Sequence, residues 1–381
     1  MSDIVSSGFV RHESGPVLPA PVFSRGPLAW LRSNLFYSIP STILTLIALY
    51  FVARYVPALI KFMTVDAVWT AQDGAPCRLE NVGACWAFVG QKLPFFTYGF
   101  YPELERWRVN VTFILCVVLI AWLLWPTAPR KNVAAALFFV AFPILAFVLL
   151  RGGLGSGLVI VGTNLWGGMM VSMIVALVGI VFSLPLGILL ALGRRSTLPI
   201  VKTFCVGFIE IVRGVPFITV LFMAQFLLPL LLPDPTWSDS FDHLLRVLIG
   251  TALFSAAYMA EEVRGGLQAM PKGQYEGAMA MGLGYWQMMR LIILPQALTL
   301  VIPGIVNNFI GLFKDTTLVA VVGIFDFLAT VDAQIKDPIW TGPFISSTGY
   351  LFAGMFFFVF CYGMSRYSQG IERKLAKSKN H

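Results

Sequence analysis

The residues of this sequence that could do chemistry lie within stretches that are otherwise apolar. Glu210 and Arg213 stand three positions apart, so on a helix they would share a face and could form an ion pair. Gly214 and Pro216 follow directly, and a proline has no N–H to donate to the preceding turn, so the helix should break there. These residues fit a kinked helix that lines a pathway, and they fit equally a structural ion pair near a membrane surface.

A second segment of this kind is 261–290, which is rich in glycine, methionine and aromatic residues. Pro271 favours the start of a short helix that would include 274–281. The glycine-containing stretch 282–284 permits a sharp turn, after which 285–291 can form another short helix. Methionine, tyrosine and tryptophan are poorly suited to bare solvent. We therefore expect either a docked protein partner or a helix that lies on the membrane surface.

The elements that must position these residues are membrane helices. Of the 381 residues, 57% are hydrophobic and 12% are charged, about half the charged share of a soluble domain. This composition excludes a soluble globule and a disordered chain, and five cysteines are too few for a disulfide scaffold. We predict an all-α polytopic membrane protein with about eight transmembrane helices. Their approximate ranges are 33–53, 109–129, 132–150, 165–192, 204–233, 244–260, 291–313 and 350–365.

The basic residues predict which helix ends face the cytoplasm. With the N-terminus inside, the inside segments hold more Lys and Arg than the outside ones, and the basic tail 367–381 returns to the inside. We expect 1–32 to be a cytoplasmic tail and not a signal peptide, because the first apolar stretch starts late and is long enough to span. The net charge of +8 then reflects cytoplasmic loops and contact with membrane lipid. No basic stripe interleaved with aromatic residues indicates nucleic acid.

The outside loop 54–108 carries Cys77 and Cys85. In an oxidising compartment this pair could form a disulfide, and the alternative is two buried thiols. The other three cysteines fall within predicted helices, where we expect them to serve packing. Neither the cysteines nor the three histidines have the spacing of a metal site, so we expect no bound metal.

The segment after the sixth predicted helix resembles the EAA loop of ABC importer permeases. The family pattern is E-A-A, three residues, G, nine residues and I-x-L-P. Here it is matched by Glu276-Gly277-Ala278, by Gly282 and by Ile292-Ile293-Leu294-Pro295, with Gly277 where alanine is usual. The resemblance implies that the loop 264–292 forms coupling helices that fit a groove on an ATPase subunit.

Three further segments resemble the polar amino-acid permeases, the group for histidine, glutamine, glutamate and arginine. They are 210–216 (E-x-x-R-G-x-P), 256–276 (A-A-Y-x-A-E to P-K-G-Q-x-E) and 313–318 (K-D-[ST]-[ST]-L), with Glu262 where a small or apolar residue is usual. The resemblance implies a five-helix type I importer permease core over 162–366. The three extra helices within 33–150 resemble those of the longer permeases of general L-amino-acid ABC transporters.

The resemblance implies the permease subunit of an ATP-driven L-amino-acid importer in the bacterial inner membrane, with both termini cytoplasmic. Its partners would be an ATPase dimer, a second homologous permease that completes a heterodimer, and a periplasmic amino-acid-binding protein. The sequence has no G-x4-G-K-[ST] loop, so we expect it to bind no nucleotide or other cofactor and not to be an enzyme. The partner ATPase would use the ATP.

An amino acid carried by such a permease needs an acceptor for its ammonium group and a donor for its carboxylate. Asp315 can accept from the ammonium, and Thr316 and Thr317 can form hydrogen bonds. Lys314 can meet the carboxylate or pair with Asp315. Arg213, with Glu210 on the same helix, is the alternative partner of the carboxylate. The stretch 314–317 could instead be a cap at the outer interface.

Two other classes also fit a polytopic membrane protein. An ion-coupled secondary amino-acid transporter would need no ATPase and usually shows inverted repeats, and we find no convincing internal repeat. A membrane enzyme would need a clustered catalytic set, whereas the histidines are scattered and G-x-S-x-G is absent. The presence of an ATPase partner distinguishes an ABC permease from both.

Overall fold

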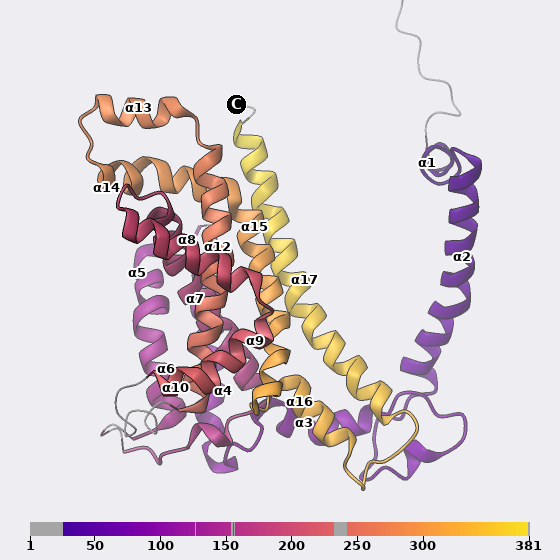
Figure 1. Cartoon of the computed structure of the whole chain (residues 1–381). Helices are drawn as coiled ribbons and strands as arrows, with labels where there is room; N and C mark the ends of the chain where they lie inside the picture. The colour runs from indigo at the N-terminus through magenta and orange to yellow at the C-terminus, as the bar shows by residue number, and fades with distance from the viewer. Residues whose placement is uncertain (1–25, 126, 154, 156, 232–241, 380–381) are drawn as a thin grey trace, which may run out of the picture. The chain divides into compact units, whose positions relative to one another are not determined.

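The computed structural model describes residues 26–125, 127–153, 155, 157–231 and 242–379, and its regular elements are helices apart from three isolated β-bridges. The chain divides into two compact units, 1–67 and 68–381. The described helices of the first unit are α1 (Pro27–Asn34), α2 (Ile39–Ile60) and the π-helical turn η2 (Lys61–Val65) (Figure 1). Most of the predicted tail 1–32 lies outside the described residues.

The helix α2 begins and ends later than the predicted helix 33–53. The Ser38 hydroxyl accepts a hydrogen bond from the N–H of Ser41 and so caps the N-terminus of α2. The helix then continues past Arg54, because a long arginine side chain can extend along a helix toward the membrane surface. The prediction that a loop begins at residue 54 was therefore wrong, since the chain is helical as far as Val65.

Besides the 3-10 turns η3 (Pro76–Arg78) and η4 (Glu103–Glu105), the described residues of the second unit before 162 form three longer helices. These are α3 (Trp86–Tyr98), α4 (Arg106–Leu124) and a continuous helix made of α5 (Lys131–Ala136), the π-turn η5 (Leu137–Ala141) and α6 (Phe142–Arg151). The α4 helix and the α5–α6 helix are long and apolar enough to cross a membrane. Arg108 lies inside α4, where its guanidinium pairs with Glu105 at 2.7 Å and donates to the Val159 carbonyl at 2.8 Å.

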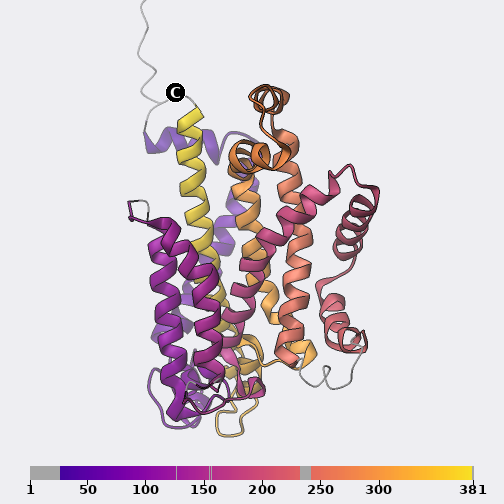
Figure 2. The ribbon, with the colours of Figure 1, turned by 90° about the vertical axis from the view of Figure 1, so that its left-hand side faces the viewer.

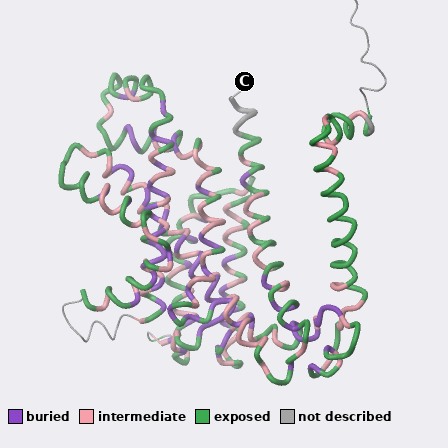
Figure 3. The backbone as a smooth tube through the Cα atoms, turned by 45° about the vertical axis from the view of Figure 1, so that its right-hand side comes forward, coloured by how far each residue is buried: buried purple, intermediate pink, exposed green. Residues whose placement is uncertain are grey.

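The remaining long helices are α7 (Gly168–Arg194), α12 (His243–Ala269), α15 (Leu294–Asp315) and α17 (Ile345–Lys379). Figures 2 and 3 show α12 packed against α7 and α15, and α17 packed along α15. The buried residues Ile345 and Ala353 of α17 lie in a cluster with residues of α3 and α16. Close approach of α7 and α12 depends on Gly187, because a Cβ atom there would lie 2.7 Å from the Cβ atom of Met259. Small residues at helix contacts are typical of membrane bundles.

The predicted helix 204–233 is broken at the place that Gly214 and Pro216 indicate. The helix α8 (Pro199–Gly214) ends there, and α9 (Phe217–Phe222) starts the second arm, which continues through η7 (Met223–Leu227) and α10 (Leu228–Leu230). The two arms are bent by 114°. Seven described helices could span a membrane, or eight if this bent pair counts as one span, which agrees with the predicted number.

Several helices extend beyond the charged residues that set the predicted limits. The helix α12 continues from the predicted end at 260 to Ala269 and so includes Glu261, Glu262 and Arg264. The seventh predicted helix starts at Tyr285 and reaches Val322, through α14 (Tyr285–Met288), the π-turn η8 (Met289–Ile293), α15 and the 3-10 turn η9 (Thr316–Val322). The eighth starts at Ile345. The charge of Glu261 is tolerated because Arg194 of α7 and Arg213 of α8 neutralise it.

Candidate functional site

The second unit has two ends that carry polar groups, joined by the long helices (Figure 1). One end holds α13 (Lys272–Ala280) and α14, and we call it the α13 end. The opposite end holds α3 and α16 (Phe327–Ile335), and we call it the α16 end.

A cavity of about 240 Å³ lies between α7, α12 and α15, and Asp315, the last residue of α15, lines it. Within the described residues, the hydroxyl of Ser255 and the amide nitrogen of Asn308 are buried there without a hydrogen-bond partner. Buried polar atoms normally have partners, so these groups indicate room for water or a polar ligand. The polar lining consists of Ser183, Ser255, Tyr258, Asn307, Asn308 and Asp315.

The four predicted residues 314–317 do not all line this cavity. The Thr316 hydroxyl is buried and donates to the Phe313 carbonyl at 2.8 Å, and the Thr317 hydroxyl donates to the Lys314 carbonyl at 3.0 Å. Lys314 is exposed and forms no ion pair with Asp315 among the described residues. Of the four residues, only Asp315 lines the cavity. The threonine hydroxyl protons are used by the helix backbone, which sequence spacing could not reveal.

Thr317 lines a different, more open groove of about 680 Å³ at the α16 end. Asp332 lies in this groove and accepts hydrogen bonds from the Lys336 ammonium at 2.6 Å and from the Tyr350 hydroxyl at 2.8 Å. The Lys336 ammonium lowers the pKa of the Asp332 carboxyl. The two charges of this groove, on Asp332 and Lys336, are therefore already paired with each other.

Glu210 and Arg213 do not pair with each other, contrary to the i, i+3 spacing. Glu210 pairs with Arg194 of α7 at 2.9 Å, and Arg213 lies 3.6 Å from Glu261 of α12. Both partners come from other helices, which sequence spacing cannot place. The Arg213 guanidinium also lies over the ring of Tyr258, 5.5 Å from its centroid. Because Tyr258 lines the cavity with Asp315, Arg213 is one side chain away from the same cavity.

Glu261 is a central residue that sequence analysis did not single out. Its carboxylate lies 2.8 Å from Arg194 and 2.6 Å from Arg264, in addition to its contact with Arg213. This network joins the ends of α7, α8 and α12 beside the α13 end. The available signal was a carboxylate within a hydrophobic helix, which requires a partner.

The predicted loop of two short helices is present at the α13 end. Pro271 precedes α13, Gly282 adopts a positive φ of 75° in the turn, and α14 follows. Glu276 and Gly277 are exposed on α13, and Gly282 is exposed in the turn. Ala278 is buried in a cluster with Met288 and Met289, whereas Leu294 is half-buried and Pro295 exposed at the start of α15. The helix α14 is not separate, because it continues through η8 into α15.

The α13 end exposes large apolar side chains although it is firmly attached. The Arg195 guanidinium donates to the Tyr275 hydroxyl at 3.1 Å, and that hydroxyl donates to the Leu267 carbonyl at 3.2 Å, so α13 is tied to α7 and α12. A fixed apolar surface of this kind is typical of a docking site for another protein. Its exposed members are Met279, Met281, Tyr285, Trp286 and Leu291.

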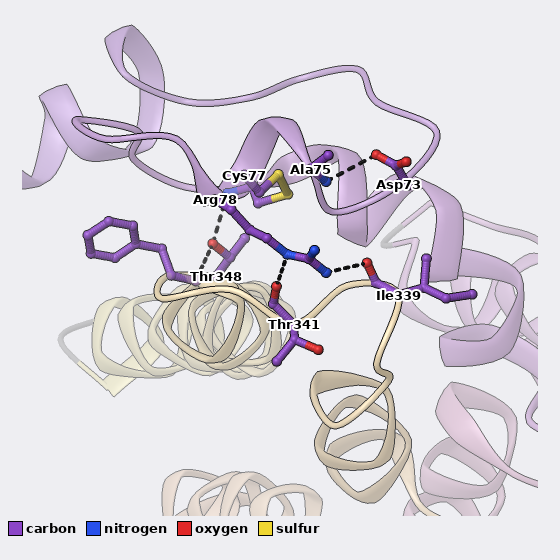
Figure 4. The surroundings of a disulfide bond; sticks show 9 residues. Asp73, Ala75, Cys77, Arg78, Ile339, Thr341 and Thr348 are labelled. Atoms are coloured by element: carbon purple, nitrogen blue, oxygen red, sulfur yellow. Dashed lines mark hydrogen bonds between the residues drawn. A yellow bond between two sulfur atoms is a disulfide. The ribbon is translucent and has the colours of Figure 1, made fainter.

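At the α16 end the structure joins Cys77 and Cys85 in a disulfide. The neighbouring Arg78 donates to the carbonyls of Thr341 and Ile339 at 2.6 and 3.1 Å (Figure 4). Lys92 of α3 pairs with Asp337 at 2.5 Å and holds the pKa of that carboxyl below its ordinary value. The segment 68–98 therefore forms a cap that is attached to the loop before α17.

The described residues contain no group of three His, Cys, Asp or Glu side chains that could hold a metal ion. The polar sites of this part of the chain are therefore the cavity with Asp315, the Glu261 network, the α13 end, the groove with Asp332 and a cavity beside α6. Hydrogen bonds and charge are what these side chains offer a ligand.

The amino-acid sequence of this chain is similar to those of known membrane transport proteins. The family model described as "Binding-protein-dependent transport system inner membrane component" matches residues 183–377. The Escherichia coli K12 protein named "Inner membrane amino-acid ABC transporter permease protein YhdY" is 45% identical over 361 residues, which cover 95% of this chain and 96% of that protein.

Two further relatives differ in how much of the chain they cover. The Rhodobacter capsulatus "Glutamate/glutamine/aspartate/asparagine transport system permease protein BztC" is 40% identical, and the alignment covers 99% of both chains. The Escherichia coli "Glutamate/aspartate import permease protein GltK" is 32% identical over 165 residues, which are 43% of this chain and 74% of that protein. Similarity over nearly the whole length is thus found with the longer permeases.

Proposed function

The chain belongs to the family of binding-protein-dependent inner membrane transport components, and from that premise we propose that it forms half of a pathway for L-glutamate, L-aspartate and their amides. It is a multi-pass inner membrane permease subunit of an ABC importer for amino acids, and it is not itself the ATPase. The substrate class is supported by the relative from Rhodobacter capsulatus, a glutamate, glutamine, aspartate and asparagine transport permease by name, which aligns over 99% of the chain.

The observation that carries this proposal is the cavity lined by Asp315. A carboxylate in a membrane helix is costly unless it has a partner or a function, and Asp315 has no ion-pair partner among the described residues. It would accept hydrogen bonds from the substrate ammonium. The buried amide of Asn308 and hydroxyl of Ser255, which have no partner, would donate to the oxygens of a carboxylate or carboxamide.

Arg213 would receive the substrate carboxylate on the side of the cavity toward the α13 end. Its guanidinium already contacts Tyr258, and its distance of 3.6 Å to Glu261 leaves room for exchange of partners. Glu210 would support this step indirectly, by holding Arg194 beside Glu261. Lys314, Thr316 and Thr317 would shape the end of α15 instead of contacting the substrate in this conformation.

The importer needs an ATPase and a binding protein, and we propose that the second permease is a homologue that forms a heterodimer with this chain. The α13 end would fit the groove of the ATPase dimer through Glu276, Gly277, Ala278 and Gly282, with Leu294 and Pro295 at the start of α15. ATP would be bound and used by the ATPase, and this chain would bind no cofactor. Movement of α13 would then rock α12 and α15 as rigid bodies.

We assign the α13 end to the cytoplasm and the α16 end to the periplasm, with both termini cytoplasmic. The disulfide at the α16 end suits an oxidising compartment. The distribution of Lys and Arg in the sequence favours the same orientation. We further propose that residues 33–150 are an addition to the core 162–366 and that 367–381 is a basic cytoplasmic tail.

Replacement of Asp315 tests the substrate site. In the assembled importer, Asp315→Asn should reduce uptake of radiolabelled glutamate and glutamine about tenfold or more, because the charge-assisted hydrogen bond to the ammonium is lost. Co-purification of the ATPase should not change. The matched control is Asp73→Asn, since among the described residues Asp73 accepts from the N–H of Ala75 and does not line the cavity. Normal uptake by Asp315→Asn would remove Asp315 from the pathway.

A competition experiment with the unmodified importer tests the substrate class. Unlabelled aspartate and asparagine should inhibit uptake of labelled glutamate, and lysine should not, because the cavity offers no second carboxylate for a side-chain cation. Equal inhibition by lysine would contradict the proposed substrate class and leave the permease function intact.

A further inference from the structure

A second cavity, of about 550 Å³, lies between α6, α7 and α12 at the α16 end. Its polar lining comes from the helix ends. Arg151 is the last residue of α6, Asp242 directly precedes α12, and Asn164 and Trp166 lie just before α7. None of these residues belongs to the cavity around Asp315 or to the α13 end.

The lining becomes apolar along the same three helices. Pro143 stands eight positions before Arg151 on α6, a distance of about 12 Å along a helix. Four of the apolar residues also line a smaller cavity of about 90 Å³, whose lining is apolar apart from Thr112, so the apolar surface continues there. The apolar lining includes Pro143, Phe147, Ile174, Val178, Leu245 and Leu248.

The polar groups at the mouth of this cavity lack partners of opposite charge. Arg151 lies over the ring of Phe147 at 5.6 Å, and within the described part of the chain it forms no ion pair. Trp166 is 6% exposed, and its buried indole N–H has no acceptor. Asp242 accepts a hydrogen bond from the Thr163 hydroxyl and likewise forms no ion pair among the described residues.

This cavity thus has a cation and an anion at its mouth, an unmatched N–H buried in its wall, and a lining that is otherwise mainly apolar. We propose that this cavity binds a phospholipid with an ethanolamine headgroup. The phosphate oxygens accept hydrogen bonds from the Arg151 guanidinium and the Trp166 indole, and the ethanolamine ammonium donates to Asp242. An acyl chain lies against α6, α7 and α12. Tryptophan is enriched where membrane helices meet the lipid headgroups.

The charges distinguish this lipid from related ligands. A phosphatidylglycerol headgroup has no ammonium and would place negative charge against Asp242. A phosphatidylcholine headgroup has a cation without N–H donors, so it could not donate to the carboxylate. A free amino acid has both charges but no chain to cover the apolar wall, and binding of an amino acid here is an outcome that the experiment below separates.

The test measures lipid retained by the assembled importer after exchange into a delipidating detergent, by native mass spectrometry. The unmodified protein should keep phosphatidylethanolamine in preference to phosphatidylglycerol. Arg151→Gln and Trp166→Phe should each reduce that retention about tenfold, because each removes a donor to the phosphate. Asp242→Asn should reverse the preference in favour of phosphatidylglycerol. The matched controls are Arg130→Gln and Trp125→Phe, which change an exposed arginine and an exposed tryptophan away from this cavity.

Three results would overturn the proposal. The first is the absence of any preference for phosphatidylethanolamine in the unmodified protein. The second is equal retention by the Trp166→Phe variant and its Trp125→Phe control, a comparison that keeps both aromatic rings and so does not depend on a disruptive substitution. The third is displacement of the bound lipid by millimolar glutamate, which would assign the cavity to an amino acid.

Discussion

Asp326 shows how one buried residue can carry opposing electrostatic effects. It is fully buried before α16, and its carboxylate accepts hydrogen bonds from the N–H groups of Leu328 at 3.0 Å and Ala329 at 3.1 Å. These bonds favour the ionised form, as does a helix N-terminus. Burial outweighs them and raises the pKa of Asp326 from 3.8 to about 6. The folded protein therefore binds a proton here more strongly than the unfolded chain does.

The raised pKa gives a direction for the effect of pH on stability. The free energy of unfolding should fall as pH rises from about 4 to about 6, and it should be level above that range. Asn has one acceptor oxygen in place of the two that these N–H groups use, so it keeps one of the two bonds, and it has no charge to bury. Asp326→Asn should therefore stabilise the protein above pH 6, by about 2 kcal/mol at most after the loss of one hydrogen bond, and should not stabilise it near pH 4. Thermal unfolding of the purified protein across this range measures the difference.

Asp332 provides the control for this prediction. The Lys336 ammonium lowers its pKa, so its contribution has the opposite sign, and Asp332→Asn should give no gain in stability above pH 6. Identical pH profiles for the unmodified protein and Asp326→Asn would mean that burial does not hold the Asp326 carboxyl protonated.

Some residue roles could be read from the sequence and others could not. Gly214 and Pro216 broke a helix where predicted, because their effect on the backbone is local. The ion pair that the spacing of Glu210 and Arg213 allows does not form, and their partners Arg194 and Glu261 could not be predicted because they lie on other helices. The lack of cavity contact by Thr316 also depends on hydroxyl direction, which residue type alone does not specify.

Among the elements, α13 is the one in which sequence and structure agree most closely. The helix and the turn at Gly282 follow from local preferences for proline and glycine, and Gly282 adopts the positive φ that glycine tolerates. Helix limits in the membrane were less predictable. They were set by counting uncharged residues, and this fails for α12, where Glu261 is neutralised by arginines from three helices.

Glu276 should contribute to docking because it is exposed on α13 and has no ion-pair partner within the described residues. Glu276→Lys reverses this charge and should weaken co-purification of the ATPase about tenfold, since charges at the rim of an interface influence association. The amount of this chain in the membrane should not change. Quantitative pull-down at moderate salt measures the effect.

Gly277→Ala is the matched control on the same helix. A Cβ atom at Gly277 would meet nothing within 4 Å, and alanine is preferred to glycine in a helix by about 1 kcal/mol. This variant should therefore retain the ATPase at least as well as the unmodified chain. Unchanged ATPase binding by Glu276→Lys would place the docking surface elsewhere on the α13 end.

At the scale of the whole molecule, the number of spans was predictable and the long-range attachments were not. The count follows from the thickness of the membrane, which requires about 20 apolar residues per helix. The cap 68–98 was predicted only as a loop, because Arg78 and Lys92 reach partners more than 240 residues away in the sequence. The cap is packed as a folded element and not as a loop, since it contains fully buried residues such as Phe88 and Phe96.

The complete importer must contain an ATPase subunit in addition to this chain. The sequence has no loop for ATP phosphates, yet the α13 end exposes Met281 and Trp286, whose exposed fractions are 78% and 68%. A tagged chain purified from its native membrane in mild detergent should therefore bring with it an ATPase that has the G-x4-G-K-[ST] motif and a second, similar permease. Mass spectrometry of the bound proteins identifies both.

The subunit composition of that complex distinguishes a heterodimer of two different permeases from a homodimer of this chain. One copy of a different permease for each copy of this chain would support a heterodimer, in which only one of two Asp315-like sites need be present. Two copies of this chain with the ATPase would contradict the heterodimer and place two identical cavities in the importer. Recovery of this chain without an ATPase would contradict docking at the α13 end. Met281 and Trp286 would then have to contact the membrane surface, because an apolar area of this kind is not left in water.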